Sequence, residues 1–423
     1  MNSNGVRRED AFHGRLRALR DGYEAVIGRE NAPAAIGSRM TGPAGLWTCY
    51  ERPVLTARHV PIDWRFDLDP NRNPRLLERL PVNSVFNAAS IELEDKVALV
   101  ARIEGADRKS FFAVAESETG VDGFRFRERP IDIEPLDERE LNMYDMRLTA
   151  HEDGWIYGVF CVEQHDRRLP PGHPEAPNAQ CGLVRTRDLD AWERLPNIRT
   201  RAAQQRNVVL HPEFVDGRYA FYTRPQDGFI EAGDGGGIGF GTCASVERPD
   251  IEDERIVDPR APHTVKESKN GLGPPPIKTD RGWLHLAHGV RGTAAGLRYV
   301  LYMFVCDLQD PSKVIARPGG YCLAPDDDER IGDVSNVLFS NGWVARGDGR
   351  VQMYYASSDT RTHVAESDAE TLIDYCFNTP ADAVTSAQAA RQRIELIEHN
   401  SAAERPAVVH IADSRRNAPS GVI

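Results

Sequence analysis

The chain has 423 residues, of which 40% are hydrophobic and 27% charged, and it carries a formal net charge of −12 at pH 7. A chain of this length can bury a large core and can hold two or three domains or a single repeat architecture. The acidic balance argues against nucleic acid or an anionic membrane as a partner, and no apolar run in the sequence approaches the roughly 18 residues of a membrane span.

The seven cysteines are scattered along the chain, and none forms a CxxC pair. An odd number of dispersed cysteines argues against a disulfide framework or a structural zinc site. The N-terminal stretch also lacks the apolar segment of a secretory signal. We therefore expect reduced thiols and a cytoplasmic protein.

The first predicted element is an amphipathic helix over residues 7–29, with Phe12, Leu16, Leu19, Tyr23 and Val26 at helical spacing. It would lie in an N-terminal helical extension, residues 1–45. Such a helix more often packs against the domain or joins subunits than takes part in chemistry, so we expect a homo-oligomer. The proline-rich segment that follows, residues 53–81, predicts an irregular connection with one helical turn near residues 75–79.

Residues 83–377 consist of short β-branched and aromatic strands separated by Gly, Asp, Asn and Pro clusters, which indicates an all-β fold. A hairpin with an aspartate in its turn recurs at intervals of about 58, 63, 64 and 68 residues, at Asp95, Asp153, Asp216, Asp280 and Asp348. Such an even period predicts a five-bladed β-propeller over residues 46–380. The alternative is a two-sheet sandwich with five hairpins, but a sandwich does not require such an even period.

The last predicted segment, residues 381–423, holds a helix near residues 383–398 and then a polar tail. It would form a C-terminal helical extension beyond the propeller.

Polar residues occupy one common position in these otherwise apolar hairpins. If every turn lies at one end of its blade, the residues entering and leaving the hairpin meet at the other end, at the mouth of the central channel. Those entering are Asn87, Asp145, Arg206, Asn207 and Lys269, and those leaving are Arg102, Arg224, His288 and Asp359. Each residue alone would pass for a polar group at a strand end, but their shared position predicts a polar pocket.

The residue types in this pocket point to an anion and an acid. Arg206 and Arg224 can offer forked N–H donors to a tetrahedral anion, and Lys269 and His288 would add point charge and further donors. The set suits inorganic phosphate or a phosphate ester. Asp145 is the best candidate acid, because the bulky tyrosine and methionines around it would desolvate it and raise its pKa.

Several long segments resemble glycoside hydrolase family 130, a family of five-bladed propellers that act on β-mannosides, most of them as phosphorylases. The segments are FNAASIELEDKVALVARIEG, YDMRLTAHEDGWIYGVF, RNVVLHPEFVDGRYAFYTRPQDGFI, GLGPPPIKTDRGWLHLAHGV, SNVLFSNGWV and YYASSDT. The resemblance covers roughly residues 45–378. Within the family, residues 51–80 and the phrase YTRPQDGFIEAGDGGGIGFG look most like the subgroup of mannosylglucose phosphorylases.

The resemblance implies a role for each pocket residue. The general acid of the family falls on Asp145. The phosphate ligands fall on Arg206, Asn207, Arg224, Lys269, His288 and Tyr299, and the mannosyl ligands on Asn87, Arg102 and Asp359. The stretch around Tyr299 matches more loosely than the others, and Ser357 replaces the usual glycine or alanine, which would alter the sugar pocket.

The expected reaction is reversible, inverting phosphorolysis of mannosyl-β-1,4-glucose to α-mannose 1-phosphate and glucose. The resemblance implies that Asp145 delivers its proton through the 3-hydroxyl of the mannose. An inverting hydrolase needs two carboxyl groups about 6.5–9.5 Å apart, whereas a phosphorylase needs only the acid, because phosphate is itself an anionic nucleophile. No metal or other cofactor is expected. The alternatives are a phosphorylase of mannooligosaccharides or mannosyl-N-acetylglucosamine, a β-mannoside hydrolase, and a sugar-binding propeller without catalysis.

Overall fold

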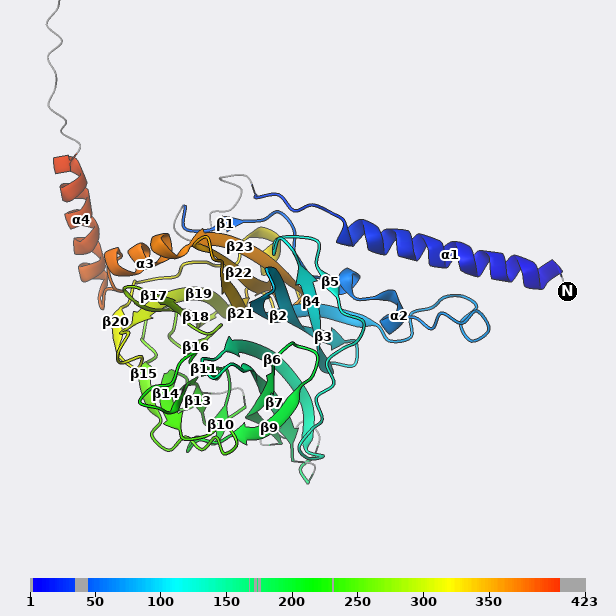
Figure 1. The fold of residues 1–423 in the computed structure, drawn as a ribbon. Helices are drawn as coiled ribbons and strands as arrows, with labels where there is room; N and C mark the ends of the chain where they lie inside the picture. The colour runs from blue at the N-terminus through cyan, green and yellow to red at the C-terminus, as the bar shows by residue number, and fades with distance from the viewer. Residues whose placement is uncertain are drawn as a thin grey trace, which may run out of the picture. The chain divides into compact units, whose positions relative to one another are not determined.

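The computed structural model describes residues 3–34, 45–166, 168–170, 173, 176–229 and 232–403. Strands dominate these residues and form five antiparallel sheets that follow one another around a ring (Figure 1). The first sheet holds β2 (Val82–Leu93), β3 (Lys96–Gly105), β4 (Ser110–Ser117) and β5 (Arg125–Phe126), and the second holds β6 (Glu140–Ala150), β7 (Ile156–His165), β8 (Pro177–Thr186) and β9 (Glu193–Ile198). The third holds β11 (Val209–Leu210), β12 (Tyr219–Thr223), β14 (Ile238–Cys243) and β15 (Arg255–Asp258).

In the fourth sheet, β16 (Lys269–Leu272) and β17 (Ile277–Thr279) both pair with β18 (Gly282–Thr293), followed by β19 (Gly296–Cys306) and β20 (Val314–Ala316). The fifth sheet holds β21 (Leu338–Ala345), β22 (Arg350–Ser357), β23 (Arg361–Asp368) and β1 (Thr48–Cys49). A separate short pair joins β10 (Gln204–Gln205) to β13 (Pro225–Gln226).

The ring is closed by strands from the two ends of the propeller sequence. β1 pairs with β23, so that Thr48 lies opposite Glu366 and Cys49 opposite Ala365. An N-terminal strand thereby completes the sheet built from the last three strands. This strand pairing joins the first part of the propeller sequence to the last by backbone hydrogen bonds, without a covalent link.

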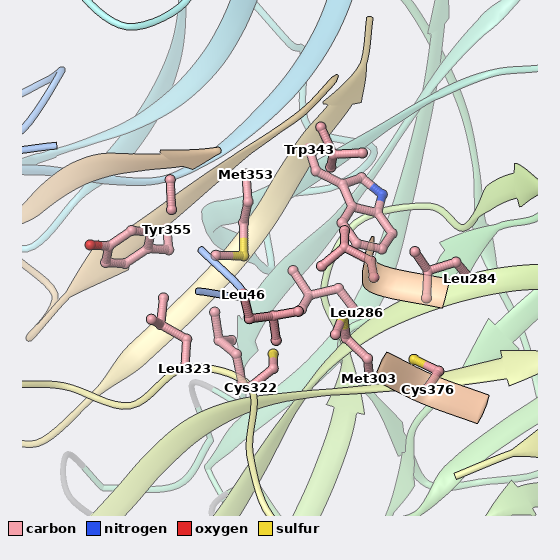
Figure 2. Packing of buried hydrophobic residues seen from close by; sticks show 14 of the residues in the cluster. Leu46, Leu284, Leu286, Met303, Cys322, Leu323, Trp343, Met353, Tyr355 and Cys376 are labelled. Carbon is pink, nitrogen blue, oxygen red and sulfur yellow. The ribbon is translucent and has the colours of Figure 1, made fainter. Parts of the chain in front are cut away.

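Five hydrophobic clusters lie between neighbouring sheets, including one between the fifth sheet and the first. Because side chains alternate across a strand, Met353 and Tyr355 of β22 face the fourth sheet whereas Tyr354 faces the first. Figure 2 shows the cluster between the fourth and fifth sheets, where Met353 and Trp343 pack with Leu286 and the α3 residue Cys376. Five sheets that each pack on two neighbours confirm the propeller and exclude the two-sheet sandwich.

The turns that carry the repeated aspartates join inner strands of the sheets, as predicted. Asp95 and Asp216 have φ angles of 66° and 51°, a left-handed conformation that aspartate tolerates better than most residues. The turns lie at the ends of the hairpins opposite the polar residues. The aspartate repeat is therefore a signature of turn geometry.

The helices lie outside the five sheets. They are α1 (Ser3–Ile27), α2 (Ile62–Arg65), α3 (Ala369–Asn378) and α4 (Ser386–Ala403), with two 3-10 turns, η1 (Ala57–His59) and η2 (Asp327–Arg330). The predicted N-terminal helix is confirmed as α1, which buries Phe12 and Leu16 against Leu76. The predicted C-terminal helix is confirmed as α4, while the polar tail from residue 404 on lies outside the described residues.

The prediction of a helical turn near residues 75–79 is wrong. Leu76 has a φ of 49° there, and Glu78 forms a β-bridge with Phe66. The physical reason is the contact with α1, since burying Leu76 beneath Phe12 fixes a left-handed backbone that no α-helix contains. The helical turns of this region form earlier, at η1 and α2.

The described chain divides into two compact units at Pro380. None of the helices described is long and apolar enough to cross a membrane.

Candidate active site

A cavity of about 790 Å³ opens where the inner strands of the sheets converge. All the residues predicted to form a site line it. They are Asn87, Arg102, Asp145, Arg206, Asn207, Arg224, Lys269, His288, Tyr299 and Asp359. The structure thus brings together residues that are up to 272 positions apart, from Asn87 to Asp359.

Four of these residues have a left-handed backbone. The φ angles of Asn87, Asp145, Asn207 and Asp359 are 47°, 60°, 52° and 54°. Register shifts in β2 and β6 fall at Asn87 and Asp145, so each residue sits on a bulge that re-aims its side chain. Such conformations cost free energy and concentrate at functional sites, and asparagine and aspartate tolerate them best.

On one side of the cavity the charges are paired. The carboxylate Oδ1 of Asp145 accepts hydrogen bonds from Asn87 Nδ2 at 2.8 Å and from Arg102 Nη1 at 3.0 Å. Arg102 also donates to Glu104 Oε2 at 2.6 Å and to Ser110 Oγ at 2.9 Å. Asp145 is therefore held in place by an amide and a guanidinium that is itself shared between two carboxylates.

The surroundings of Asp145 differ from the expected enclosure by bulky neighbours. Met146 points away, into the core between the first and second sheets, because consecutive strand residues face opposite sides. The ring of Tyr144 lies 4.6 Å from the guanidinium carbon of Arg102, which has Phe86 at 4.4 Å. The bulky residues thus pack on both sides of Arg102, and Arg102 positions the Asp145 carboxylate.

Asp359 is the carboxyl of this side whose protonation is most altered. Burial raises the pKa of Asp359 to about 7, against the opposing effect of Arg102 and with a further rise from Asp145. This carboxyl keeps its proton to a higher pH than an ordinary aspartate does. It can therefore both donate and accept a hydrogen bond.

On the opposite side of the cavity two guanidinium groups are buried without a carboxylate. Among the described residues neither Arg206 nor Arg224 forms an ion pair, and Nε and Nη2 of Arg206 and Nε of Arg224 have no hydrogen-bond partner. The ring of Phe229 lies 4.1 Å from the Arg206 guanidinium carbon. Burial lowers the pKa of Arg224 to about 10, and Arg206 lowers it further. Buried, unpaired like charges are costly, and an anion placed between them would remove that cost.

The fourth sheet supplies the rest of this cationic side. Lys269 lies opposite Val290 and Gly271 opposite His288, so the hairpin holds the lysine and the histidine side by side. The ring of His288 stacks on Tyr299 with centroids 6.0 Å apart and an interplanar angle of 19°. Tyr299 therefore belongs to the site, although its surroundings matched the family pattern loosely.

The surroundings of His288 disfavour the point charge expected from the sequence. Burial, helped by Arg224, Arg147 and Lys269, holds the pKa of His288 well below 6.5. The neutral imidazole lies 3.4 Å, through Nε2, from Asn207 Nδ2. A neutral imidazole adds no charge to this side of the cavity, whose cationic groups are Arg206, Arg224 and Lys269.

Sequence reasoning missed Glu104 and Arg147. Each lies two residues after a predicted site residue, Glu104 after Arg102 and Arg147 after Asp145, and strand alternation places such pairs on one face. That period-two signal could have identified Glu104, whereas the bulge at Asp145 interrupts the alternation before Arg147. Ser357, in contrast, does not line the cavity: its Oγ lies 2.9 Å from His363 Nε2, so it does not alter the sugar pocket as expected.

Comparison with known proteins gives a consistent result. The family model for glycoside hydrolase 130, described as beta-1,4-mannooligosaccharide phosphorylase, matches residues 61–378. A Bacteroides fragilis protein named 4-O-beta-D-mannosyl-D-glucose phosphorylase is 54% identical over 389 residues, which are 92% of this chain and 98% of that protein. A beta-1,4-mannooligosaccharide phosphorylase from Ruminococcus albus is 28% identical over 322 residues, covering 74% and 90% of the two chains.

Among solved structures, the beta-1,2-mannobiose phosphorylase from Listeria innocua, in complex with beta-1,2-mannobiose, aligns with a TM-score of 0.60. The alignment covers 77% of this chain and 97% of that one at 22% identity. At this identity the likeness supports the fold alone.

Proposed function

The chain belongs to glycoside hydrolase family 130, and from that premise we propose that it is an inverting phosphorylase of 4-O-β-D-mannosyl-D-glucose. The reaction breaks the β-1,4 bond with inorganic phosphate and gives α-D-mannose 1-phosphate and D-glucose, and it is reversible. The choice of substrate rests on the 54% identity to the Bacteroides fragilis enzyme of that name.

The observation that carries phosphorolysis is the pair of buried, unpaired guanidinium groups. Arg206 and Arg224 line the cavity, and buried N–H groups of both have no partner among the described residues, at a place where a hydrolase would need a carboxylate to activate water. Forked guanidinium donors fit the oxygens of phosphate. In this proposal phosphate is bound by Arg206, Asn207, Arg224, Lys269, His288 and Tyr299.

The other side of the cavity would hold the mannosyl unit and protonate the leaving sugar. Asn87, Arg102 and Asp359 are the proposed mannosyl ligands, and Asp145 is the proposed general acid. Family resemblance assigns the route of the proton, from Asp145 through the mannose 3-hydroxyl to the glycosidic oxygen. Phosphate attacks the anomeric carbon from the opposite face, so the configuration inverts, and the fixed positions of the two sides hold the attacking and leaving groups in line.

The test is incubation with mannosyl-glucose with and without inorganic phosphate, followed by NMR of the anomeric protons. We expect α-mannose 1-phosphate and glucose only with phosphate. Free mannose at the same rate in both samples would indicate a hydrolase, and binding without turnover a sugar-binding protein. Mannobiose and mannosyl-N-acetylglucosamine, offered in parallel, test the acceptor, and a faster reaction with either would replace glucose in the proposal.

The domain boundaries and the setting of the enzyme are part of the same proposal. Residues 46–380 would form the catalytic domain, and residues 1–45 and 381–423 its helical extensions. All seven cysteines are buried thiols, which supports the cytoplasm, where thiols stay reduced. Phosphate acts as a co-substrate with no other cofactor, and light scattering checks the expected homo-oligomer.

A further inference from the structure

Arg147 is a buried cation that contacts both sides of the cavity without lining it. Its side chain belongs to β6 and is 1% exposed. Among the described residues no carboxylate pairs with it. Its charge is instead compensated by oxygen atoms from three sheets or their flanking segments.

One arm of the guanidinium reaches the proposed acid. Nη1 donates a hydrogen bond of 2.6 Å to the backbone carbonyl oxygen of Asp145. This is the residue whose φ of 60° places it on the bulge of β6. Because a left-handed aspartate has no intrinsic preference for this geometry, the hydrogen bond to its carbonyl group helps to fix the direction of the carboxylate.

The other arm reaches the phosphate side. Nη2 donates to Asn207 Oδ1 at 2.9 Å. A carboxamide whose oxygen is engaged in this way turns its NH2 group to the opposite side, and Asn207 Nδ2 lies 3.4 Å from His288 Nε2 at the cavity. Arg147 thereby selects the orientation in which Asn207 offers donors to an anion.

The guanidinium group also contacts the fourth sheet and its surroundings. Nε lies 3.3 Å from the Gly273 carbonyl oxygen, Nη2 lies 3.4 Å from that of Leu272, and the guanidinium carbon is 5.5 Å from the Phe339 ring. A planar fork with donors in fixed directions can serve all these acceptors at once, whereas a lysine ammonium cannot.

We infer that Arg147 is a positioning residue that sets the proposed acid Asp145 and the proposed phosphate ligand Asn207 relative to each other. It touches neither substrate. The inference rests on the proposed function and adds to it a rigid link between the acid side and the phosphate side of the cavity.

The test compares Arg147→Lys and Arg147→Met with Arg194→Met. Arg194 is the control, because it is a largely buried arginine of the same sheet that also donates to two carbonyl groups and an asparagine, with Phe160 at 5.1 Å. It differs from Arg147 in pairing with the buried Glu140 at 3.3 Å, so its folding is checked by a thermal melt. It does not line the cavity. Calorimetry with inorganic phosphate alone reports binding, and initial rates at saturating phosphate and mannosyl-glucose report kcat.

We expect both Arg147 variants to bind phosphate at least about tenfold more weakly and to lose at least about tenfold in kcat, with Arg194→Met within about twofold of wild type. In an Asn207→Ala background, Arg147→Lys should change phosphate affinity by less than about threefold while still lowering kcat, because there is no Asn207 side chain left to orient but the hydrogen bond to Asp145 is still lost. A structural role alone would not separate the two readouts in this way.

The opposite results overturn the inference. The inference is wrong if Arg147→Lys has the same phosphate affinity and kcat as Arg194→Met. It is also wrong if the losses of phosphate affinity in Arg147→Lys and Asn207→Ala add up in the double variant. Loss of folding in both Arg147 variants, with Arg194→Met folded, would assign Arg147 a purely structural role. A wild-type protein that neither binds phosphate nor cleaves mannosyl-glucose refutes the proposed function itself, and this inference with it, before any variant is compared.

Discussion

The two sides of the cavity differ in how their buried arginines are compensated. Burial disfavours the charge of Arg102, but Asp145 and Glu104 outweigh it and hold the pKa of Arg102 above its ordinary value. Burial lowers the pKa of Arg224 to about 10, and the charge of Arg206 lowers it further. The first side is electrostatically complete and suits neutral sugar hydroxyls, while the second lacks an anion and suits phosphate.

The two sides of the cavity are also formed by different sheets of the ring. The paired side comes from the first, second and fifth sheets, and the unpaired side from the third and fourth. A hydrolase and a phosphorylase need the same acid, so the difference between them lies on the unpaired side. The predictions below test each side in turn.

The largest effect is expected for Asp145→Asn on the paired side. The amide keeps an oxygen that can accept from Asn87 and Arg102 but has no proton to give, so kcat should fall by about 10²- to 10⁴-fold. Steady-state rates measure this, and calorimetry should show phosphate affinity within about threefold of wild type, since the Asp145 carboxylate accepts its hydrogen bonds from Asn87 and Arg102. A near-normal rate would remove Asp145 from the acid role.

Arg224→Met and Arg102→Met should have opposite effects on stability. Removing Arg102 leaves Asp145 and Glu104 without their cation, which costs about 3–5 kcal/mol. Removing Arg224 deletes an unpaired buried charge, so the phosphate-free protein should melt at the same or a higher temperature. Thermal melts without phosphate measure both.

Arg224→Met should weaken phosphate binding, although it leaves the phosphate-free protein at least as stable as wild type. Loss of charge-assisted hydrogen bonds worth about 1.5–3 kcal/mol should raise the KM for phosphate roughly 10- to 100-fold in Arg224→Met. Arg248→Met, which alters an exposed arginine, is the control and should change stability by less than about 0.5 kcal/mol. If Arg224→Met destabilises the phosphate-free protein as Arg102→Met does, the contrast between the two sides is wrong.

The sequence predicted these two sides unequally, for physical reasons. The hairpin repeat is local, so the turn at Asp95 and the convergence of Asn87 and Asp145 on one cavity followed from the period and from the common position of polar residues in the hairpins. The neutral state of His288 did not, because it depends on burial beside arginines from another sheet. The anchoring of Arg147 on the Gly273 carbonyl group likewise depends on how the sheets pack, and no pattern within one hairpin records it.

A pH-dependent effect of intermediate size is expected for Asp359. The raised pKa of about 7, compared with an ordinary 3.8, means that the folded state binds a proton more tightly than the unfolded state. Its stabilising contribution is therefore complete below pH 3.8 and is lost as the pH rises through 7. Asp359→Asn removes that loss, so its melting temperature should exceed that of wild type by a margin that grows between pH 4 and 7 and then levels off.

The Asp359→Asn variant should also bind mannosyl-glucose more weakly, since an amide cannot replace the carboxylate as an acceptor on both oxygens. Differential scanning calorimetry at several pH values measures the first effect, and the KM for the sugar the second. A margin in melting temperature that is independent of pH would show that this carboxyl titrates normally.

The smallest effect is expected for Ser357→Ala, because Ser357 lies next to the paired side but outside the cavity. Ser357 is fully buried and lies two residues before Asp359, but its hydroxyl faces His363, at 2.9 Å, and not the cavity. Losing this hydrogen bond should cost about 1 kcal/mol of stability, while kcat/KM for mannosyl-glucose should stay within about twofold of wild type. Asp359→Asn is the matched comparison in the same segment, with the larger loss in sugar binding. A change of sugar specificity in Ser357→Ala would place this serine on the sugar side of the cavity after all.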